Sequence, residues 1–227
     1  MSRRNSAARR SNKVQETSSS LRIIGGEWRS RKLSFPEIEG LRPTPDRVRE
    51  TLFNWLQTSI PGASCLDLFC GSGALGFEAL SRGAASVTFV DKAPEVIYHL
   101  RHNLNLLKAQ HGEVVSSNVL DWLETKIANQ EARYDVVFLD PPFNKNLIAP
   151  VTTLLESRGL LNDQAFIYVE SEINWQPDAI PQNWELYREK QAGQVCYRLY
   201  QRSEPEDSED SLTYSEEESP PFGSVHR

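Results

Sequence analysis

Sulfur-bearing residues are scarce in this chain of 227 residues, which holds three cysteines and one methionine. The cysteines form no Cys-x-x-Cys pair and are odd in number, which argues against a disulfide framework or a structural zinc site and is typical of a reducing cytosol. No apolar run reaches membrane-spanning length, and the first residues lack the hydrophobic segment of a signal peptide. His99 and His102 have no third ligand in view, so no metal site is predicted. These absences indicate a cytoplasmic protein without a membrane partner.

Charge is distributed unevenly along the chain, whose formal net charge is −6. Residues 1–20 carry +4 and residues 203–227 carry −7, and both segments are rich in serine and poor in periodic apolar residues. Such segments bury too little apolar surface to offset the entropy lost on ordering. We therefore predict a disordered basic arm over 1–20, a folded domain over 21–202 and a disordered acidic tail over 203–227.

Between these ends, short apolar runs alternate with helical periodicity, which is typical of an α/β protein with a largely parallel sheet. Strands are predicted at 64–69, 86–91, 113–118, 134–140 and 164–171. Two final runs, at 184–191 and 194–201, alternate with period two around Ala192-Gly193, which predicts an antiparallel hairpin that closes the sheet. This arrangement suits the methyltransferase variant of the Rossmann sheet better than a dinucleotide dehydrogenase.

A smaller extension, residues 21–60, precedes the catalytic core predicted over 61–202. Gly25-Gly26 predicts a two-residue hairpin turn, after which Arg29 and Arg31 would alternate onto one face of a strand. Basic side chains gather around this hairpin in an otherwise slightly acidic domain. We predict phosphate contacts, which give affinity without sequence choice, from Arg22, Arg29, Arg31, Lys32 and Arg42.

A helix is predicted to follow this hairpin. Thr44 reads as its N-cap and Pro45 as its first residue. Its core-facing stripe would leave Arg47 and Arg49 pointing away from the core; the stripe is Val48, Leu52, Trp55 and Ser59.

The loop after the strand at 64–69 contains Gly71-x-Gly73-x-x-Gly76, with Asp91 twenty residues beyond Gly71. This spacing satisfies the dinucleotide fingerprint, so the glycines alone do not distinguish NAD from another nucleotide cofactor. Asp67, inside the strand, favours a different ligand. A carboxylate would repel a pyrophosphate but attract the ammonium and sulfonium groups of S-adenosylmethionine. We therefore predict S-adenosylmethionine.

The strand at 134–140 ends in Asp140-Pro141-Pro142-Phe143. Ligands of such sheets bind at the carboxyl ends of the strands, so Asp140 is expected to face the cofactor. Its carboxylate and the rigidly held Pro141 carbonyl could accept the two N–H groups of a nucleobase amine, and Phe143 could stack on the base. A second Pro-Pro-Phe, within 219–223, has no strand before it and is assigned no role.

Five stretches of the sequence carry a family resemblance. They are "LRIIGGEWRSRKLSFP", "LRPTPDRVRETLFNWL", "DLFCGSGALGFEALSRGA", "FVDKA" and "VVFLDPPF". The region 21–202 resembles the bacterial RsmD-type 16S rRNA (guanine-N2)-methyltransferases, which act on guanine 966 of the small subunit. The first two stretches are specific to that family, and the others are shared by many N-methyltransferases.

The resemblance implies roles for individual residues. The methyl-transfer corner would be Asp140, Pro141, Pro142 and Phe143. The S-adenosylmethionine pocket would be lined by Asp67, Phe69, Gly71, Ser72, Gly73, Asp91, Lys92, Asn118, Val119 and Asp140. Asp91 would hold the ribose hydroxyls of the cofactor; position 91 is often Glu in the family, and the Asp side chain is one carbon shorter. The implied partner is 16S rRNA, within the small ribosomal subunit or an assembly intermediate, and a monomer is expected.

Two alternatives remain open from the residues themselves. The first is methylation of another exocyclic amine, such as N6 of adenine in DNA or the amide of a protein glutamine. The second is a non-catalytic RNA-binding assembly factor that retains the fold. Cys70, in the glycine loop, could act as a nucleophile for carbon methylation, but its position among cofactor-binding glycines favours a small space-filling residue.

Overall fold

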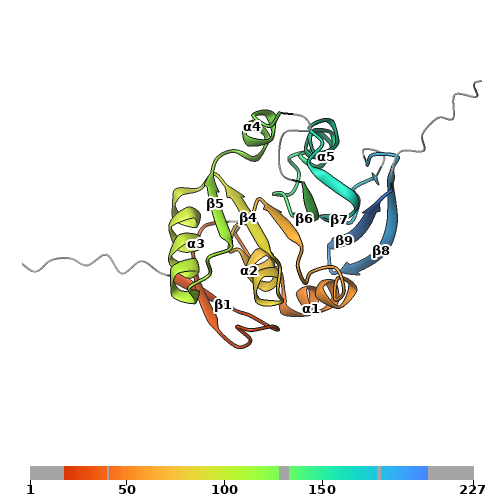
Figure 1. Ribbon diagram of the computed structural model, residues 1–227. Helices are drawn as coiled ribbons and strands as arrows, with labels where there is room; N and C mark the ends of the chain where they lie inside the picture. The colour runs from red at the N-terminus through yellow and green to blue at the C-terminus, as the bar shows by residue number, and fades with distance from the viewer. Residues whose placement is uncertain (1–17, 40, 128–132, 178–179, 204–227) are drawn as a thin grey trace, which may run out of the picture.

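The computed structural model describes residues 18–39, 41–127, 133–177 and 180–203, which form a three-layer α/β domain (Figure 1). The elements are, in chain order, β1 (Ser18–Arg22), β2 (Lys32–Pro36), α1 (Asp46–Trp55), β3 (Ser64–Leu68), α2 (Ala74–Ser81), β4 (Ser86–Asp91), α3 (Pro94–Leu107), β5 (Gly112–Ser116), α4 (Val119–Glu124), β6 (Tyr134–Leu139), α5 (Ile148–Ser157), β7 (Leu161–Glu172), β8 (Trp184–Ala192) and β9 (Val195–Arg202).

Seven strands form the central sheet in the order β5-β4-β3-β6-β7-β9-β8. The five strands from β5 to β7 pair in parallel, whereas β9 pairs antiparallel with both β7 and β8. The predicted fold class, parallel strands closed by a C-terminal antiparallel hairpin, is therefore confirmed. Strand order reverses between β3 and β6, which is the point where sheets of this kind bind ligands.

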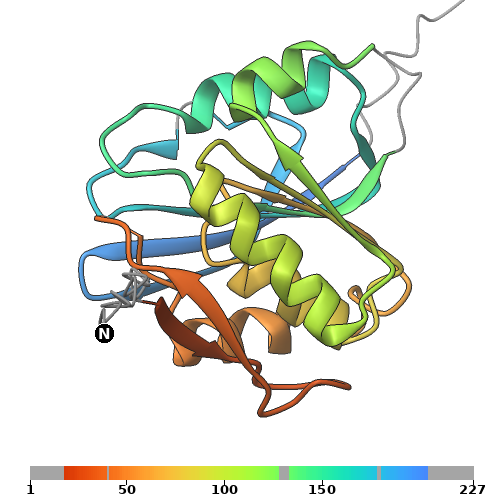
Figure 2. The same ribbon diagram turned by 90° about the vertical axis from the view of Figure 1, so that its left-hand side faces the viewer.

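The alternation of side chains along the strands sets which residues reach which layer. Cys65 and Phe138 lie in a core cluster with residues of α1, α2 and α3, whereas Leu66 and Leu139 lie in a second cluster with residues of α4 and α5. Figures 1 and 2 show the same division, with α1, α2, α3 and the β1–β2 hairpin on one face of the sheet and α4 and α5 on the other.

The N-terminal hairpin forms, but the predicted two-residue turn at Gly25-Gly26 is wrong. Its antiparallel strands are joined by a longer connection over 23–31. Gly26, with φ +74°, is required for a different reason: a Cβ there would lie 1.8 Å from the carbonyl oxygen of Ser81. The two glycines therefore let the connection approach α2 closely instead of reversing the chain.

Other boundaries and elements also differ from expectation. β1 begins at Ser18, inside the segment predicted as an arm, while the rest of that arm and 204–227 lie outside the described residues. α1 begins at Asp46, with Pro45 as its N-cap residue and Thr44 buried before it. The helices α4 and α5 were not predicted. Within the described segments, no helix combines the length and apolar character that a membrane span requires.

Candidate active site and nucleic-acid interface

The glycine loop lies between β3 and α2, at the carboxyl edge of the sheet. Gly71 and Gly73 have positive φ angles of 48° and 73°, which few other residues adopt without strain. At Gly76, a Cβ would lie 2.2 Å from the Phe89 ring and 2.9 Å from Asp67 Oδ2. Glycine at this position therefore allows α2 to pack closely against the sheet, next to the predicted cofactor pocket.

Asp67 lies on β3 with 3% of its surface exposed. Its Oδ2 accepts a hydrogen bond from the Gly76 N–H at 2.9 Å. Burial raises the pKa of Asp67 well above its ordinary range; the bond from Gly76 acts in the opposite direction and the nearby Asp91 adds to the rise. The carboxylate form of Asp67 would therefore be stabilised by a cationic ligand.

Asp91, the last residue of β4, connects its strand to the glycine loop. Its Oδ2 accepts from the Gly71 N–H at 3.0 Å and its Oδ1 accepts from the Ala93 N–H at 2.9 Å. Each oxygen retains a second lone pair, so a ribose diol could add to these bonds. The arrangement fixes the position of the carboxylate before any ligand binds.

The remaining predicted cofactor residues surround the same strand ends with different exposure. Ser72 is buried in the loop, Phe69 is half-buried with φ +58°, and Lys92 is exposed. Asn118 is the N-cap of α4, where its Oδ1 accepts from the Leu120 N–H at 2.9 Å. Val119 is buried in the core cluster of α4 and α5, so its side chain contributes to packing.

The corner 140–143 begins where β6 ends. Asp140 is half-buried, Pro141 is buried, Pro142 is exposed and the Phe143 ring is 40% exposed. Burial, and after it the negative charges of Glu170 and Asp67, raise the pKa of Asp140 well above its ordinary range. An exposed ring beside a half-buried carboxyl is the arrangement that the amine-methylation hypothesis requires.

Asp67 and Glu170 both raise the pKa of Asp140 at this edge of the sheet. Both charged groups that raise the pKa of Asp140 are negatively charged when ionised. A ligand with an ammonium and a sulfonium would supply the missing positive charge, whereas a pyrophosphate would add to the repulsion. The donor set therefore fits S-adenosylmethionine. Within the described residues, no cluster of three or more His, Cys, Asp or Glu side chains could hold a metal ion.

The predicted RNA-facing cations are exposed, but not all of them lie on strands. Arg22 ends β1 and donates to Asp46 Oδ2 at 3.3 Å, and Lys32 begins β2. Arg29 and Arg31 belong to the 23–31 connection, so the predicted alternation along a strand is wrong for them. Arg42 lies between the hairpin and α1, exposed like the other four.

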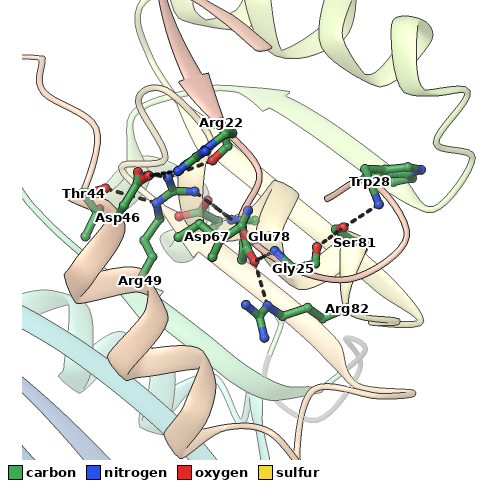
Figure 3. Close-up of polar contacts among 12 residues, drawn as sticks. Arg22, Gly25, Trp28, Thr44, Asp46, Arg49, Asp67, Glu78, Ser81 and Arg82 are labelled. Carbon is green, nitrogen blue, oxygen red and sulfur yellow. Dashed lines mark hydrogen bonds and ion pairs between the residues drawn. The ribbon is translucent and has the colours of Figure 1, made fainter. Parts of the chain in front are cut away.

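The buried ion pairs beneath this hairpin were missed from the sequence. Arg49, predicted to point away from the core, is 1% exposed, and its Nη1 lies 3.5 Å from Oε2 of the fully buried Glu78 on α2. Arg49 also donates to the carbonyl oxygens of Thr44 and Arg22 and to Asp46 Oδ1 (Figure 3). The buried residues of α1 are at positions 48, 49, 52 and 53, so Arg49 lies at a helical spacing from Phe53, but its charge gave no sign in the sequence that it would be buried.

Glu78 in turn holds the connection of the hairpin. Its two carboxylate oxygens accept from the N–H groups of Ile24 and Gly25, at 2.9 and 2.8 Å, and from Arg82 Nε at 2.7 Å. Ser81 Oγ donates to the Gly25 carbonyl and accepts from the Trp28 N–H (Figure 3). The hairpin is thus bound to α2, the helix that the glycine loop opens.

Comparison with known proteins covers this same folded region. A family model described as "Conserved hypothetical protein 95" matches residues 21–201. "Ribosomal RNA small subunit methyltransferase D" of Escherichia coli strain K12 is 53% identical over 185 residues, which are 82% of this chain and 91% of that protein. The protein of the same name from Haemophilus influenzae is 50% identical over 183 residues, 80% of this chain and 93% of its own length.

A solved structure is also similar to this chain over most of its length. The structure titled "Putative methyltransferase yhhF from Escherichia coli" is 52% identical and has a TM-score of 0.74. The match covers 82% of this chain and 99% of that one. The family model, which matches residues 21–201, spans most of the hairpin extension, the glycine loop and the antiparallel end of the sheet.

Proposed function

This chain belongs to the family of ribosomal RNA small subunit methyltransferase D, and we propose that it methylates the exocyclic N2 amine of guanine 966 in 16S rRNA. It is an S-adenosylmethionine-dependent rRNA methyltransferase by that membership. The observation in the structure that supports the proposal most directly is the meeting of Asp140, Phe143 and the acidic cofactor edge at the switch point of the sheet.

Residues of the glycine loop and the neighbouring strand ends would hold the cofactor. Asp91 is fixed by two backbone N–H groups and would accept the ribose hydroxyls. Asp67 would provide the negative charge opposite the positively charged amino acid portion of the ligand. Asn118 caps α4 through its Oδ1, which leaves its amide group to donate to an adenine.

Asp140 and the Pro141 carbonyl would orient the substrate amine. An amine attached to a nucleobase is a poor nucleophile, because its lone pair is delocalised into the ring. Two acceptors on its N–H groups favour a pyramidal nitrogen that is aimed at the methyl group, and Phe143 would stack on the base. S-adenosylmethionine brings an already activated methyl group on a sulfonium, so the reaction requires no covalent bond to the enzyme.

Cys70 does not suit the alternative role of nucleophile. Burial, followed by the charges of Asp67 and Asp91, raises the pKa of the thiol well above its ordinary value. The thiolate is the reactive form, so a thiol that keeps its proton at neutral pH is a poor nucleophile. This supports transfer to an amine without a cysteine intermediate.

The exposed cations of the hairpin and of the segment before α1 would contact RNA phosphates; they are Arg22, Arg29, Arg31, Lys32 and Arg42. The substrate would be 16S rRNA in the small subunit or an assembly intermediate, and the reaction would take place in the cytoplasm. Because the hairpin connection is bonded to α2, these contacts would hold RNA at a fixed position relative to the cofactor loop.

The test is mass-mapping of modified nucleosides after incubating the protein and S-adenosylmethionine with small-subunit RNA from a strain that lacks the corresponding gene. Free RNA and assembled small subunits are separate arms. We expect N2-methylguanosine at position 966 in at least one arm, and none with Asp140→Ala. A methylated adenine, or unmodified RNA in both arms, would overturn the proposal.

A further inference from the structure

Glu170 is a buried carboxylate for which the reaction above gives no role. It lies near the end of β7 with 8% of its surface exposed. β6 and β7 are parallel neighbours, paired in register up to Leu139 and Val169. Asp140 and Glu170 are the next residues along these two strands, so they lie side by side at the carboxyl edge.

The two carboxyls also share a face of the sheet. Phe138 and Tyr168, two positions before Asp140 and Glu170, both belong to the core cluster of α1, α2 and α3. Because side chains alternate along a strand, Asp140 and Glu170 project to that same side, as does Asp67 on β3. The corner therefore holds two adjacent carboxyls.

Tyr168 fixes the position of Glu170. Its phenol donates to Glu170 Oε2 at 2.7 Å, and the tyrosine has no exposed surface. Burial, then the charges of Glu170 and Asp140, raise the pKa of Tyr168 well above its ordinary value, so the phenol remains a donor. Burial raises the pKa of Glu170 while the bond from Tyr168 lowers it, so Tyr168 favours the ionised glutamate.

Among the described residues, the charged groups that raise the pKa of Asp140 are both carboxyls. β3 contributes Asp67, and β9 contributes Tyr197, whose ring centroid is 6.4 Å from that of Tyr168. Arg198, the next residue of β9, alternates onto the opposite face. The pKa of Asp140 is therefore raised by two neighbouring carboxyls, and Glu170 raises it more than Asp67 does.

We propose that Glu170 is a positioning residue for methyl transfer: held by Tyr168 beside Asp140, its negative charge makes Asp140 a stronger acceptor for the proton of the substrate amine. The inference rests on the proposed function. As the bond between N2 and the methyl carbon forms, the carbon–sulfur bond breaks, the sulfur keeps the electron pair and one N2 proton moves to an Oδ atom of Asp140.

A purely structural role, in which Glu170 only satisfies the buried phenol, predicts a different result. Under that role, Glu170→Gln would lower stability or rate without changing the proton affinity of Asp140. Under our proposal, that affinity falls when the neighbouring charge is removed. The two roles are therefore separated by titration of Asp140.

The first measurement is a carbon-13 NMR titration of the Asp140 carboxyl in the ligand-free full chain, with its resonance identified by its loss in Asp140→Asn. In Glu170→Gln the midpoint should fall by about one pH unit. Tyr168→Phe should move it in the same direction by less, which keeps the test available if Glu170→Gln does not fold. Glu185→Gln, an exposed glutamate of β8, should leave it unchanged. An unchanged midpoint in both site variants would overturn the proposal.

The second measurement is single-turnover methyl transfer against pH at saturating S-adenosylmethionine. The acidic limb of the wild-type profile should move to lower pH in Glu170→Gln and Tyr168→Phe and stay in place in Glu185→Gln. A rate that falls equally at every pH would assign Glu170 a structural role. Absence of transfer by the wild type would count against the proposed function, whereas the ligand-free titration would still decide the role of Glu170.

Discussion

Asp67 combines a cost to the stability of the fold with a proposed role in cofactor binding. A carboxylate buried without a cation destabilises the ligand-free protein, and burial is the largest cause of its raised pKa. The unfolded carboxyl has a pKa near 3.8, so the folded state binds the proton more tightly. The contribution of Asp67 to stability is therefore fully present below that value and is lost as pH rises toward the folded pKa.

Asp67→Asn should remove this loss of stability at higher pH, and its amide oxygen can still accept the hydrogen bond from the Gly76 N–H. We expect the ligand-free variant to be at least as stable as the wild type at pH 7, with the difference shrinking toward pH 4, in urea denaturation. Its affinity for S-adenosylmethionine, measured by calorimetry, should fall. A variant that binds the cofactor as tightly as the wild type would contradict the proposed electrostatic role of Asp67.

Asp140 should matter for the reaction more than for binding of RNA. Asp140→Ala removes the proposed acceptor of the amine proton, so methyl transfer should fall on the order of 10²–10⁴-fold, the range for a lost acid–base group. RNA affinity should change little, because the predicted phosphate contacts lie on the hairpin and on the segment before α1. Asp121→Ala, an exposed aspartate of α4, is the matched control. Turnover close to wild type in Asp140→Ala would make the corner structural.

At the scale of elements, the pair of Arg49 on α1 and Glu78 on α2 joins two helices to the hairpin. Arg49→Met would leave Glu78 with one fewer cation, and removal of one partner of a buried pair costs about 3–5 kcal/mol. We expect a loss of stability of that order in denaturant unfolding, together with weaker RNA binding because the connection 23–31 loosens. Arg47→Met, exposed on the same helix, should change neither. Equal unfolding midpoints for the two variants would show that the pair contributes nothing to the fold.

The pair of Arg49 and Glu78 is also an example of a contact that the sequence pattern does not predict. The strands of the core were predictable, because apolar runs such as Val136 to Leu139 are buried on both faces of a parallel sheet. In the predicted stripe of α1, Val48 and Leu52 are buried as expected, but the buried Arg49 was missed, since a charged residue is rarely buried unless it is paired. Its partner, Glu78, lies on another helix, and no spacing along the chain reveals that contact.

The candidate site likewise contains some residues that the sequence predicts and others that it does not. The glycine loop, Asp91 and the corner at Asp140 were predictable from local motifs, because each follows a strand end directly. Glu170 was not, since its significance comes from the register of β6 against β7 and from the bond with Tyr168. Gly26 was misassigned because a turn and a close approach to α2 both favour glycine.

At the scale of the whole molecule, a protein with a net charge of −6 must bind a polyanion through a local basic surface. If the hairpin cations contact phosphates, affinity should fall steeply as salt rises. Replacing Arg29 and Arg31 by Ala should weaken binding and reduce the log–log salt slope by roughly one unit per lost contact. Ala at the exposed Arg188 and Lys190 of β8 is the control with equal charge change.

The charged ends of the chain belong in the same salt series. Because β1 begins at Ser18, the arm deletion should stop at residue 17. Because Ser203 bonds to the Asn183 carbonyl, the tail deletion should begin at 204. Removing the arm should weaken binding less than the paired arginine substitutions. Removing the acidic tail should tighten binding at low salt if, as we predict, the tail competes with RNA for the hairpin cations. Identical salt slopes for the wild type and the Arg29/Arg31 variant would mean that the hairpin does not touch phosphate, and unchanged affinity without the tail would exclude the competition.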